Sequence, residues 1–306
     1  MTGGINIEGC LLATAPGVFT LLLIMEKMRP YKKLAALGLK RSFSTNASAF
    51  MANNLIMSLL SISSLLVVAE HHSHHGLLSS LKDAPLKWAL SFVLFDFGVY
   101  VWHFLGHKLE YLWRFHKIHH SDKSIHVSTG LRFHIFDQFL EVIFKCICTV
   151  AIGVEAHVVV VCELVRMLFV LFHHANLSFP GEKWLSYVVI TPSLHRGHHS
   201  TLRSEHDSNY GIVLSVWDIL FGTRKESVPK SIGLELIEAE NLVQLFSLAF
   251  VTEWNFARLL HLLPRQQTIS ARRLSAAPTE DHNVAIQMLG ADRLKGISSA
   301  AAKNAF

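Results

Sequence analysis

The sequence predicts an all-α fold: an integral-membrane helical bundle of four or five spans, with a cytoplasmic helical cap that carries clustered histidines. Composition is the first reason, because 51% of the 306 residues are hydrophobic and only 17% are charged, against about 25% charged in a soluble domain. Second, the apolar residues gather in long runs, and a bilayer span needs about 20 of them. Third, most of the 20 histidines lie in tight groups at or beyond the ends of these runs.

Five apolar segments are the expected spans, and they cover residues 9–25, 47–69, 88–105, 139–153 and 156–172. No basic segment precedes the first one, so it is expected to remain as a span rather than to be removed as a signal peptide. A short turn near Glu155 separates the last two, which predicts a tight helical hairpin. If that hairpin is re-entrant, the number of spans is four.

Basic residues predict the orientation of these spans. A cluster of them lies between the first two spans: Lys27, Arg29, Lys32, Lys33, Lys40 and Arg41. Because cytoplasmic loops are enriched in lysine and arginine, this loop is expected in the cytoplasm. Counting along the chain then places the main histidine groups on the cytoplasmic face of a multi-pass protein, in a bacterial inner membrane or the endoplasmic reticulum. The net charge of +5 fits such loops, and no nucleic-acid partner is expected.

The two ends of the chain have their own expectations. Residues 1–85 are the N-terminal membrane spans. Residues 229–263 include an apolar stretch that is interrupted by Glu253, Asn255 and Arg258, which is typical of an amphipathic helix lying in the membrane interface. Residues 264–306 are rich in alanine, serine and arginine and are predicted to be disordered.

Four histidine groups follow one another along the chain. His103 and His107 have the i, i+4 spacing that places both rings on one face of a helix, although an isolated pair is commonly just a polar feature of a membrane boundary. The pattern H-x-x-H-H then occurs at residues 116–120 and again at 195–199, and each copy can offer up to three ring nitrogens to a metal. His173 and His174 close the fifth span. The repetition argues against a reading of these groups as solvated polar loops.

So many imidazoles indicate metal chemistry. Neutral imidazole suits iron, zinc and copper, and eight or nine ligands exceed what a single ion uses but fit two ions. Two adjacent irons can reduce O2 and oxidise an unactivated C–H bond, and a membrane location brings an apolar substrate to them. The sequence has no G-x-G-x-x-G motif of a nicotinamide or flavin site, so the electrons are expected from outside.

The residues around the histidines resemble a known superfamily. Residues 113–122 (WRFHKIHHSD), 129–134 (TGLRFH), 191–200 (TPSLHRGHHS), 207–211 (DSNYG) and 217–223 (WDILFGT) carry this resemblance. Together with the H-x-x-x-H pair, they resemble the fatty acid hydroxylase/sterol desaturase superfamily of membrane histidine-box oxygenases. The flanking residues are most similar to the alkylglycerol monooxygenase-like and bacterial sterol desaturase branch. The similarity covers about residues 86–225.

The resemblance implies a di-metal catalytic domain over residues 86–228. It assigns metal ligation to His103, His107, His116, His119, His120, His174, His195, His198 and His199. The implied cofactors are two iron ions, which zinc can replace in a purified sample, together with O2 and an external electron donor. The implied partners are a lipid substrate (fatty acyl, sterol or ether lipid) and a donor that is a cytochrome b5-like protein, a ferredoxin or a reduced pterin. The product, whether of hydroxylation, desaturation or ether cleavage, stays open.

Further polar residues are candidates to support the ligands by hydrogen bonds: Asp96, His134, His173 and Asn176. Asp96 lies two helical turns before His103, and pairing with a polar group of a neighbouring span is the equal alternative. His173 stands where relatives often have asparagine, and His126 where many have an acidic residue.

Charged residues inside the last two spans have two interpretations. Glu141 and Lys145 are spaced i, i+4, and Glu163 and Arg166 are spaced i, i+3, so mutual pairing is expected. Alternatively, Glu163 or Arg166 faces a substrate tunnel.

A further histidine-rich stretch falls outside the expected site. His71, His72, His74 and His75 lie on the opposite face of the membrane in the predicted topology, so a solvated loop is expected there.

Two other functional classes remain open. One is a haem protein that carries electrons between histidine pairs, for which a strong Soret band would be diagnostic. The other is a membrane metal-binding or metal-transport protein without oxygenase activity. A transporter would carry polar residues near the midplane of several spans, where only Asp96, Glu163 and Arg166 qualify.

Overall fold

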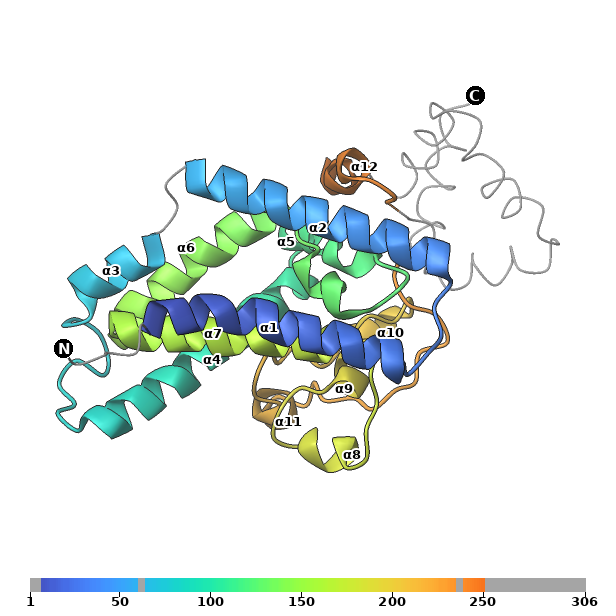
Figure 1. Ribbon diagram of the computed structural model, residues 1–306. Coiled ribbons are helices and arrows are strands. Elements are labelled where there is room, and N and C mark those ends of the chain that lie inside the picture. Colours follow the sequence, from blue (N-terminus) through green and yellow to red (C-terminus); the bar gives the residue numbers. More distant parts are fainter. Residues whose placement is uncertain (1–6, 60–63, 235–238, 251–306) are drawn as a thin grey trace, which may run out of the picture. The chain divides into compact units, whose positions relative to one another are not determined.

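The computed structural model describes residues 7–59, 64–234 and 239–250. These residues form α-helices and short 3-10 helices, with two isolated β-bridges and no strand. The long helices (Figure 1) are α1 (Ile7–Met28), α2 (Ala36–Leu59), α4 (Ala84–Lys108), α6 (Ile135–Ile152) and α7 (Ala156–His174), and α4 packs on both α6 and α7. The shorter elements are α3 (Ser64–His72), α5 (Glu110–His116), η1 (His119–Ser121), η2 (Val127–Leu131), α8 (Glu182–Leu185), α9 (Pro192–His198), α10 (Arg203–His206), α11 (Val216–Leu220), α12 (Leu242–Ser247) and η3 (Leu248–Phe250). The predicted all-α class is confirmed for this part of the chain.

Helix α4 carries the first histidine pair, and it begins earlier than the apolar pattern predicts. The Asp83 side chain caps it by accepting a hydrogen bond from the Leu86 amide at 3.0 Å. Pro85 in the first turn favours the same start, because its missing N–H has no partner to lose there. The helix packs against α5, α6 and α7, so its last two turns lie inside the bundle.

The predicted turn near Glu155 is confirmed. Helix α6 ends at Gly153, whose φ of 82° lies in the left-handed region, and Glu155 is the residue before α7. A Cβ on Gly153 would collide with the His75 carbonyl oxygen, so the close approach of the loop before α4 also requires glycine.

The expected span 47–69 corresponds to two helices, α2 and α3, while residues 60–63 lie outside the described residues. Helix α2 begins at Ala36, so the prediction that Lys40 and Arg41 belong to a loop is wrong. The reason is tertiary: buried Asn46 and Asn53 on this helix donate hydrogen bonds to the segment that follows α5. Contacts of this kind cannot be read from hydropathy.

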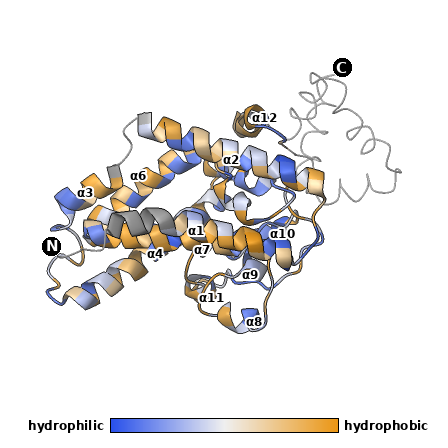
Figure 2. Ribbon diagram, viewed as in Figure 1, coloured by the Kyte–Doolittle hydropathy of each residue, from blue (hydrophilic) through white to orange (hydrophobic). Residues whose placement is uncertain are grey.

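Two helices have the length and apolar content to cross a bilayer among those described, α4 and α7. Figure 2 shows hydrophobic residues concentrated on the long helices, and large apolar side chains such as Leu21, Met51 and Ile147 are exposed there. Exposed apolar surface of this extent is typical of a membrane-facing bundle. The number of spans and their orientation stay predictions.

The short helices α8 to α11 gather beside the C-terminal end of α7 (Figure 1), where α9 packs against it. Helix α12 and η3 form the start of the expected amphipathic segment, and α12 packs against α2. The rest of that segment and the expected disordered tail, residues 251–306, lie outside the described residues.

Candidate metal centre

Nine buried imidazoles meet in two groups at the junction of α4, α5, α7 and α9. The first group is His103, His107, His116, His120 and His198. The second group is His119, His174, His195 and His199. In each group one ring nitrogen per residue lies within 4.8 Å of all the others. Both H-x-x-H-H motifs divide their histidines between the two groups, so the groups share their supporting elements. The structure thus brings together all nine predicted ligands, and their binding of metal stays a prediction.

The Nε2 atoms of the four-imidazole group lie close to one another. The Nε2 atom of His174 lies 3.0 Å from that of His119 and 2.9 Å from that of His195. The Nε2 atom of His199 lies 3.1 Å from that of His195. Ligand nitrogens that surround one ion at about 2.0–2.1 Å are themselves about 3 Å apart.

The hydrogen bonds of this group favour a cation between the rings. The Nδ1 atom of His119 lies 3.2 Å from the Arg132 carbonyl oxygen, and that of His174 lies 2.6 Å from the Val170 carbonyl oxygen. A carbonyl oxygen only accepts, so both Nδ1 atoms carry the proton. In neutral imidazole, both Nε2 atoms then present lone pairs to each other. Burial and neighbouring histidines hold the pKa of His119 well below its ordinary value, which disfavours the protonated ring that would relieve this repulsion.

The five-imidazole group is oriented in the same way. The Nδ1 atom of His103 donates to the Tyr210 carbonyl oxygen at 2.8 Å, and that of His198 donates to the Ser208 carbonyl oxygen at 2.6 Å. Both acceptors belong to the loop that precedes α11. This loop therefore fixes the tautomers of two rings on two different helices.

A carboxylate holds a third ring of this group. The Nδ1 atom of His116 lies 3.1 Å from an oxygen of Asp137, and Nδ1 of His107 lies 3.5 Å from an oxygen of Asp207. The buried Nε2 atoms of four members have no hydrogen-bond partner: His107, His116, His120 and His198. Unpartnered buried nitrogens are costly unless a ligand satisfies them.

Both groups therefore fit the binding of a metal ion. For five of the imidazoles that lie outside the long helices, burial lowers the pKa well below its ordinary value. At neutral pH they are therefore uncharged and can offer a lone pair to a metal ion: His119, His120, His195, His198 and His199. Neutral imidazole nitrogens suit iron, zinc and copper. Nine of them exceed the needs of one ion and suffice for two.

Asp218 supports the site from a distance, and the sequence patterns did not predict this role. Its buried carboxylate accepts hydrogen bonds from the amides of Tyr210 and Gly211, both at 2.8 Å, and from the Thr223 hydroxyl at 2.6 Å. Burial raises the pKa of Asp218, and these bonds partly offset the rise. Asp218 thereby fixes the loop whose carbonyl oxygens orient His103 and His198. Its place in the 217–223 motif was a signal, but no spacing linked it to the histidines.

Asp96 does not act as predicted on a ligand imidazole. Its carboxylate accepts hydrogen bonds from Trp217 Nε1 at 2.8 Å and from the Leu214 amide at 3.3 Å. It therefore ties α4 to α11 and the segment that leads into it, so its partners are neither a ligand imidazole nor a polar group of a neighbouring span.

The other three supporting candidates have no hydrogen bond to a ring of either group in the described part of the chain. The His134 side chain caps α6 by accepting from the Phe136 amide, and its ring stacks on Phe115. Asn176 bonds to the backbone of Lys32 and contacts neither group by a hydrogen bond among the described residues. His173 packs on His195 with ring centroids 3.9 Å apart and belongs to neither group.

His126, a departure from the family pattern, takes part in a buried polar network. Its Nε2 atom bonds to the Ser42 hydroxyl at 3.1 Å, and that hydroxyl also donates to Asp122 at 2.7 Å. Arg132 donates to Asn46 and to Ser121 in the same network. The network joins α2 to residues 121–132, which directly follow His119 and His120 in the chain.

The charged residues of α6 and α7 pair with one another and also border the site. The ion pairs join Lys145 to Glu163 at 2.8 Å and Arg166 to Glu163 at 3.0 Å, while Glu141 lies 3.4 and 3.5 Å from Lys145 and Arg166. Glu141 and Arg166 line a cavity of about 40 Å³ with His103, His119 and His174. The predicted mutual pairing is therefore confirmed, and a substrate tunnel at Glu163 or Arg166 stays a prediction.

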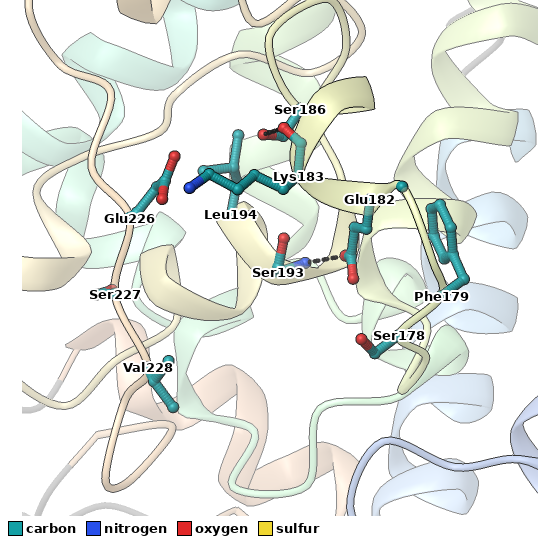
Figure 3. Close-up of a pocket in the computed structure, with 11 residues that line it drawn as sticks. Ser178, Phe179, Glu182, Lys183, Ser186, Ser193, Leu194, Glu226, Ser227 and Val228 are labelled. Carbon is teal, nitrogen blue, oxygen red and sulfur yellow. Dashed lines mark hydrogen bonds between the residues drawn. The ribbon is translucent and has the colours of Figure 1, made fainter.

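Two other features lie apart from the metal groups. The stretch of His71, His72, His74 and His75 is exposed as predicted, although His71 and His72 belong to the last turn of α3 rather than to a loop. A larger cavity of about 510 Å³, shown in Figure 3, is lined by residues of α8, the start of α9 and residues 226–228, and by none of the nine imidazoles. Glu182 inside it accepts a hydrogen bond from the Ser193 amide, which anchors the start of α9.

Comparison with known proteins agrees with this geometry. Residues 88–223 match the family model of the fatty acid hydroxylases. The chain is 28% identical over 218 residues to the ornithine lipid hydroxylase OlsE of Rhizobium tropici, an alignment that covers 66% of this chain and 63% of that protein. It is 32% identical over 142 residues to the alkylglycerol monooxygenase of Homo sapiens, covering 46% of this chain and 31% of that protein. It is 25% identical over 227 residues to the cholesterol 25-hydroxylase-like protein of Danio rerio, covering 68% and 89%.

The chain thus spans less than two thirds of the first two of these relatives, and no solved structure matches it. All nine imidazoles of the two groups fall inside the matched segment. Residues 88–223 are therefore a domain of the fatty acid hydroxylase family.

Proposed function

We propose that this protein is a membrane-bound oxidoreductase that uses two iron ions and O2 to oxidise a lipid at an unactivated C–H bond, by hydroxylation, desaturation or a related reaction. One observation carries the proposal: the Nε2 atoms of His119 and His174 face each other at 3.0 Å while both Nδ1 protons are engaged. A cation between the two nitrogens would accept both lone pairs without charging a buried ring, which supports a metal site here.

The five-imidazole group would hold one ion and the four-imidazole group the other. When bound, the two ions supply the reduction of O2 by an external donor, in which one oxygen atom enters the lipid or both leave as water. The chain's own contribution is to fix each ring by its Nδ1 proton, so that the Nε2 lone pairs converge before any ion arrives.

An apolar wall adjoins the imidazoles and would position the substrate. Val99, Trp102, Phe133, Val170 and Ile212 line the small cavity that rings of both groups also line. These side chains exclude water and offer a hydrocarbon segment no hydrogen bond, so it can approach the ligands from the apolar bundle. Glu141 and Arg166 are the charged residues of the same cavity, where a polar part of the lipid would meet them.

The remaining assignments follow from the sequence. The protein is proposed to be multi-pass, with the histidine groups at the cytoplasmic face of a bacterial inner membrane or the endoplasmic reticulum. Its electrons would come from a cytochrome b5-like protein, a ferredoxin or a reduced pterin.

A histidine-rich metal-binding or haem electron-transfer protein without oxygenase activity is the second candidate. A haem is disfavoured, because a haem iron takes one or two axial ligands from the protein, whereas each group gathers the ring nitrogens of four or five histidines within 4.8 Å of one another. Zinc binding without redox chemistry would use the same nitrogens, so only an experiment distinguishes it from the proposed iron-dependent oxidation.

Anaerobic purification with metal analysis and lipid profiling of expressing cells tests the proposal. Two irons per chain and one shifted lipid species are expected. His119→Ala and His198→Ala, one from each group, should abolish turnover, whereas the exposed His72→Ala should not. A strong Soret band, stoichiometric zinc without O2 consumption, or full activity of both group variants would contradict the proposal.

A further inference from the structure

A second cavity, away from the metal groups, is lined by cations. It has a volume of about 180 Å³ and lies between the loop after α1, the segment after α7, the middle of α9 and residues 229–232. Its charged lining residues are Lys32, Lys123, Arg196 and Lys230, and no acidic residue lines it. The larger cavity of Figure 3 differs, because Glu182 and Glu226 accompany Lys183 there.

The floor of this cavity is rigidly built. The Tyr31 amide donates to the Asn176 carbonyl oxygen at 2.8 Å, and the Lys32 amide donates to the Asn176 side chain at 3.1 Å. The Asn176 amide group in turn donates to the Lys32 carbonyl oxygen at 2.8 Å. These bonds clamp the end of α1 to the end of α7, so Lys32 has a fixed backbone position at the rim.

Arg196 supplies a buried positive charge to the same cavity. Its guanidinium lies 3.7 Å from the centroid of the Tyr31 ring and donates one hydrogen bond to the Leu177 carbonyl oxygen at 3.0 Å. Neither contact is an ion pair, so both orient the group without neutralising it. The charge of Glu182, which lines the other cavity, also acts on Arg196. A guanidinium has five N–H donors in a planar fork, a geometry that matches a phosphate or carboxylate oxygen pair.

The size and the location select the kind of anion. A water molecule occupies about 30 Å³ of liquid, so 180 Å³ accepts a group of several heavy atoms. The cavity lies just beyond the last residue of α7, one of the two helices able to cross a bilayer. The end of such a helix lies at the level of the lipid headgroups.

We propose that this cavity binds the phosphate group of an anionic lipid headgroup, with Arg196 at its base and Lys32 and Lys230 at its rim. The site is separate from the proposed metal chemistry. It lies close to it in sequence, however, because Arg196 directly follows His195. An anionic lipid bound there would hold α9 against the ends of α1 and α7.

Binding to the purified protein in a non-ionic detergent tests this. Calorimetric titrations compare dihexanoyl phosphatidylglycerol, zwitterionic dihexanoyl phosphatidylcholine and inorganic phosphate. Phosphatidylglycerol should bind, and Lys32→Ala and Lys230→Ala should each weaken it about fivefold, the usual contribution of one basic residue near an anionic surface. Lys183→Ala, which removes a lysine from the other cavity, is the matched control.

The outcomes separate the sources of the phosphate. Tighter binding of phosphatidylglycerol than of inorganic phosphate supports a lipid headgroup, and equal binding of the two supports the site with free phosphate as its ligand. Unchanged affinity in a Lys32→Ala/Lys230→Ala double variant, equal binding of phosphatidylcholine, or no binding at all overturns the inference. The metal content of each variant is measured alongside and should stay that of the parent, so a failure here leaves the proposed function untouched.

Discussion

The substitution Asp218→Asn tests whether the metal groups depend on a loop that touches no metal. Asp218 accepts three hydrogen bonds on one buried carboxylate, from the amides of Tyr210 and Gly211 and from the Thr223 hydroxyl. Asparagine has nearly the same shape, but one of its two oxygens becomes an NH2 donor. That donor must face an N–H or O–H donor, whichever way the amide is turned.

The size of the effect follows from these bonds. A hydrogen bond to a charged group contributes about 1.5–3 kcal/mol, and at least one is replaced by a donor–donor contact. We therefore expect the free energy of unfolding to fall by about 2–4 kcal/mol, and the thermal midpoint by roughly 5–10 °C. The shifted Ser208 and Tyr210 carbonyl oxygens would also release the Nδ1 protons of His198 and His103, and losses of such supporting bonds lower metal affinity about 10–100-fold.

The assay is competition between the metal-loaded protein and a chelator, with metal per chain measured by mass spectrometry, together with a thermal melt. Asp83→Asn is the control, because Asp83 is the exposed cap of α4 and asparagine caps a helix as well as aspartate does. Retention of both metals at the parental affinity in Asp218→Asn, with an unchanged melt, would refute the role of this loop.

Three further predictions follow from other parts of the structure. Burial keeps the imidazoles of the two groups neutral in the folded state, so the unfolded chain binds more protons than the folded one below about pH 6.5. The free energy of unfolding of the metal-free protein should therefore fall by about 1.4 kcal/mol per pH unit for each such histidine. A thermal midpoint that falls from pH 7.5 to 5.5 is expected, and an unchanged midpoint would contradict the prediction. Glu163→Ala removes the carboxylate that pairs with Lys145 and Arg166, and should lower the free energy of unfolding by about 3 kcal/mol. The control Glu226→Ala, at an exposed ion pair, should lower it by less than about 1 kcal/mol. Equal thermal midpoints of the two variants would show that the ion pairs of Glu163 do not stabilise the protein. Gly153→Ala should destabilise more than Gly181→Ala by about 1–2 kcal/mol, since both have positive φ but only Gly153 has a backbone carbonyl in the way of a Cβ; a smaller loss at Gly153 would show that the α6–α7 turn can relax.

Much of the site could be predicted from the sequence, because its histidines are recognisable by their residue type and spacing. The repeated H-x-x-H-H motif and the H-x-x-x-H pair, with the resemblance they carry, named all nine imidazoles that the structure brings together. The division into groups of five and four could not be predicted. It depends on where α5 ends and η1 begins, and on how α9 meets α7, which are tertiary properties.

The supporting contacts were harder to predict, for a physical reason. Asp96 has the right helical spacing to reach His103, yet its partner Trp217 arrives from a segment 121 residues later in the chain. Helical periodicity reports only which residues of one helix share a face. The same limit applies to the basic residues at the start of α2, which the sequence places in a loop. Contacts with the segment before α6 stabilise α2, and hydropathy does not report such contacts.

The chemical nature of the groups that accept hydrogen bonds from the Nδ1 atoms of the imidazoles has a further consequence. Four of these acceptors are peptide carbonyl oxygens, those of Arg132, Val170, Ser208 and Tyr210, and every amino acid supplies such an oxygen. The acceptor itself therefore does not depend on the identity of the side chain at these positions, provided the backbone keeps its path. Homologues that process different lipids can remodel the walls around the imidazoles and leave the tautomers of the rings intact.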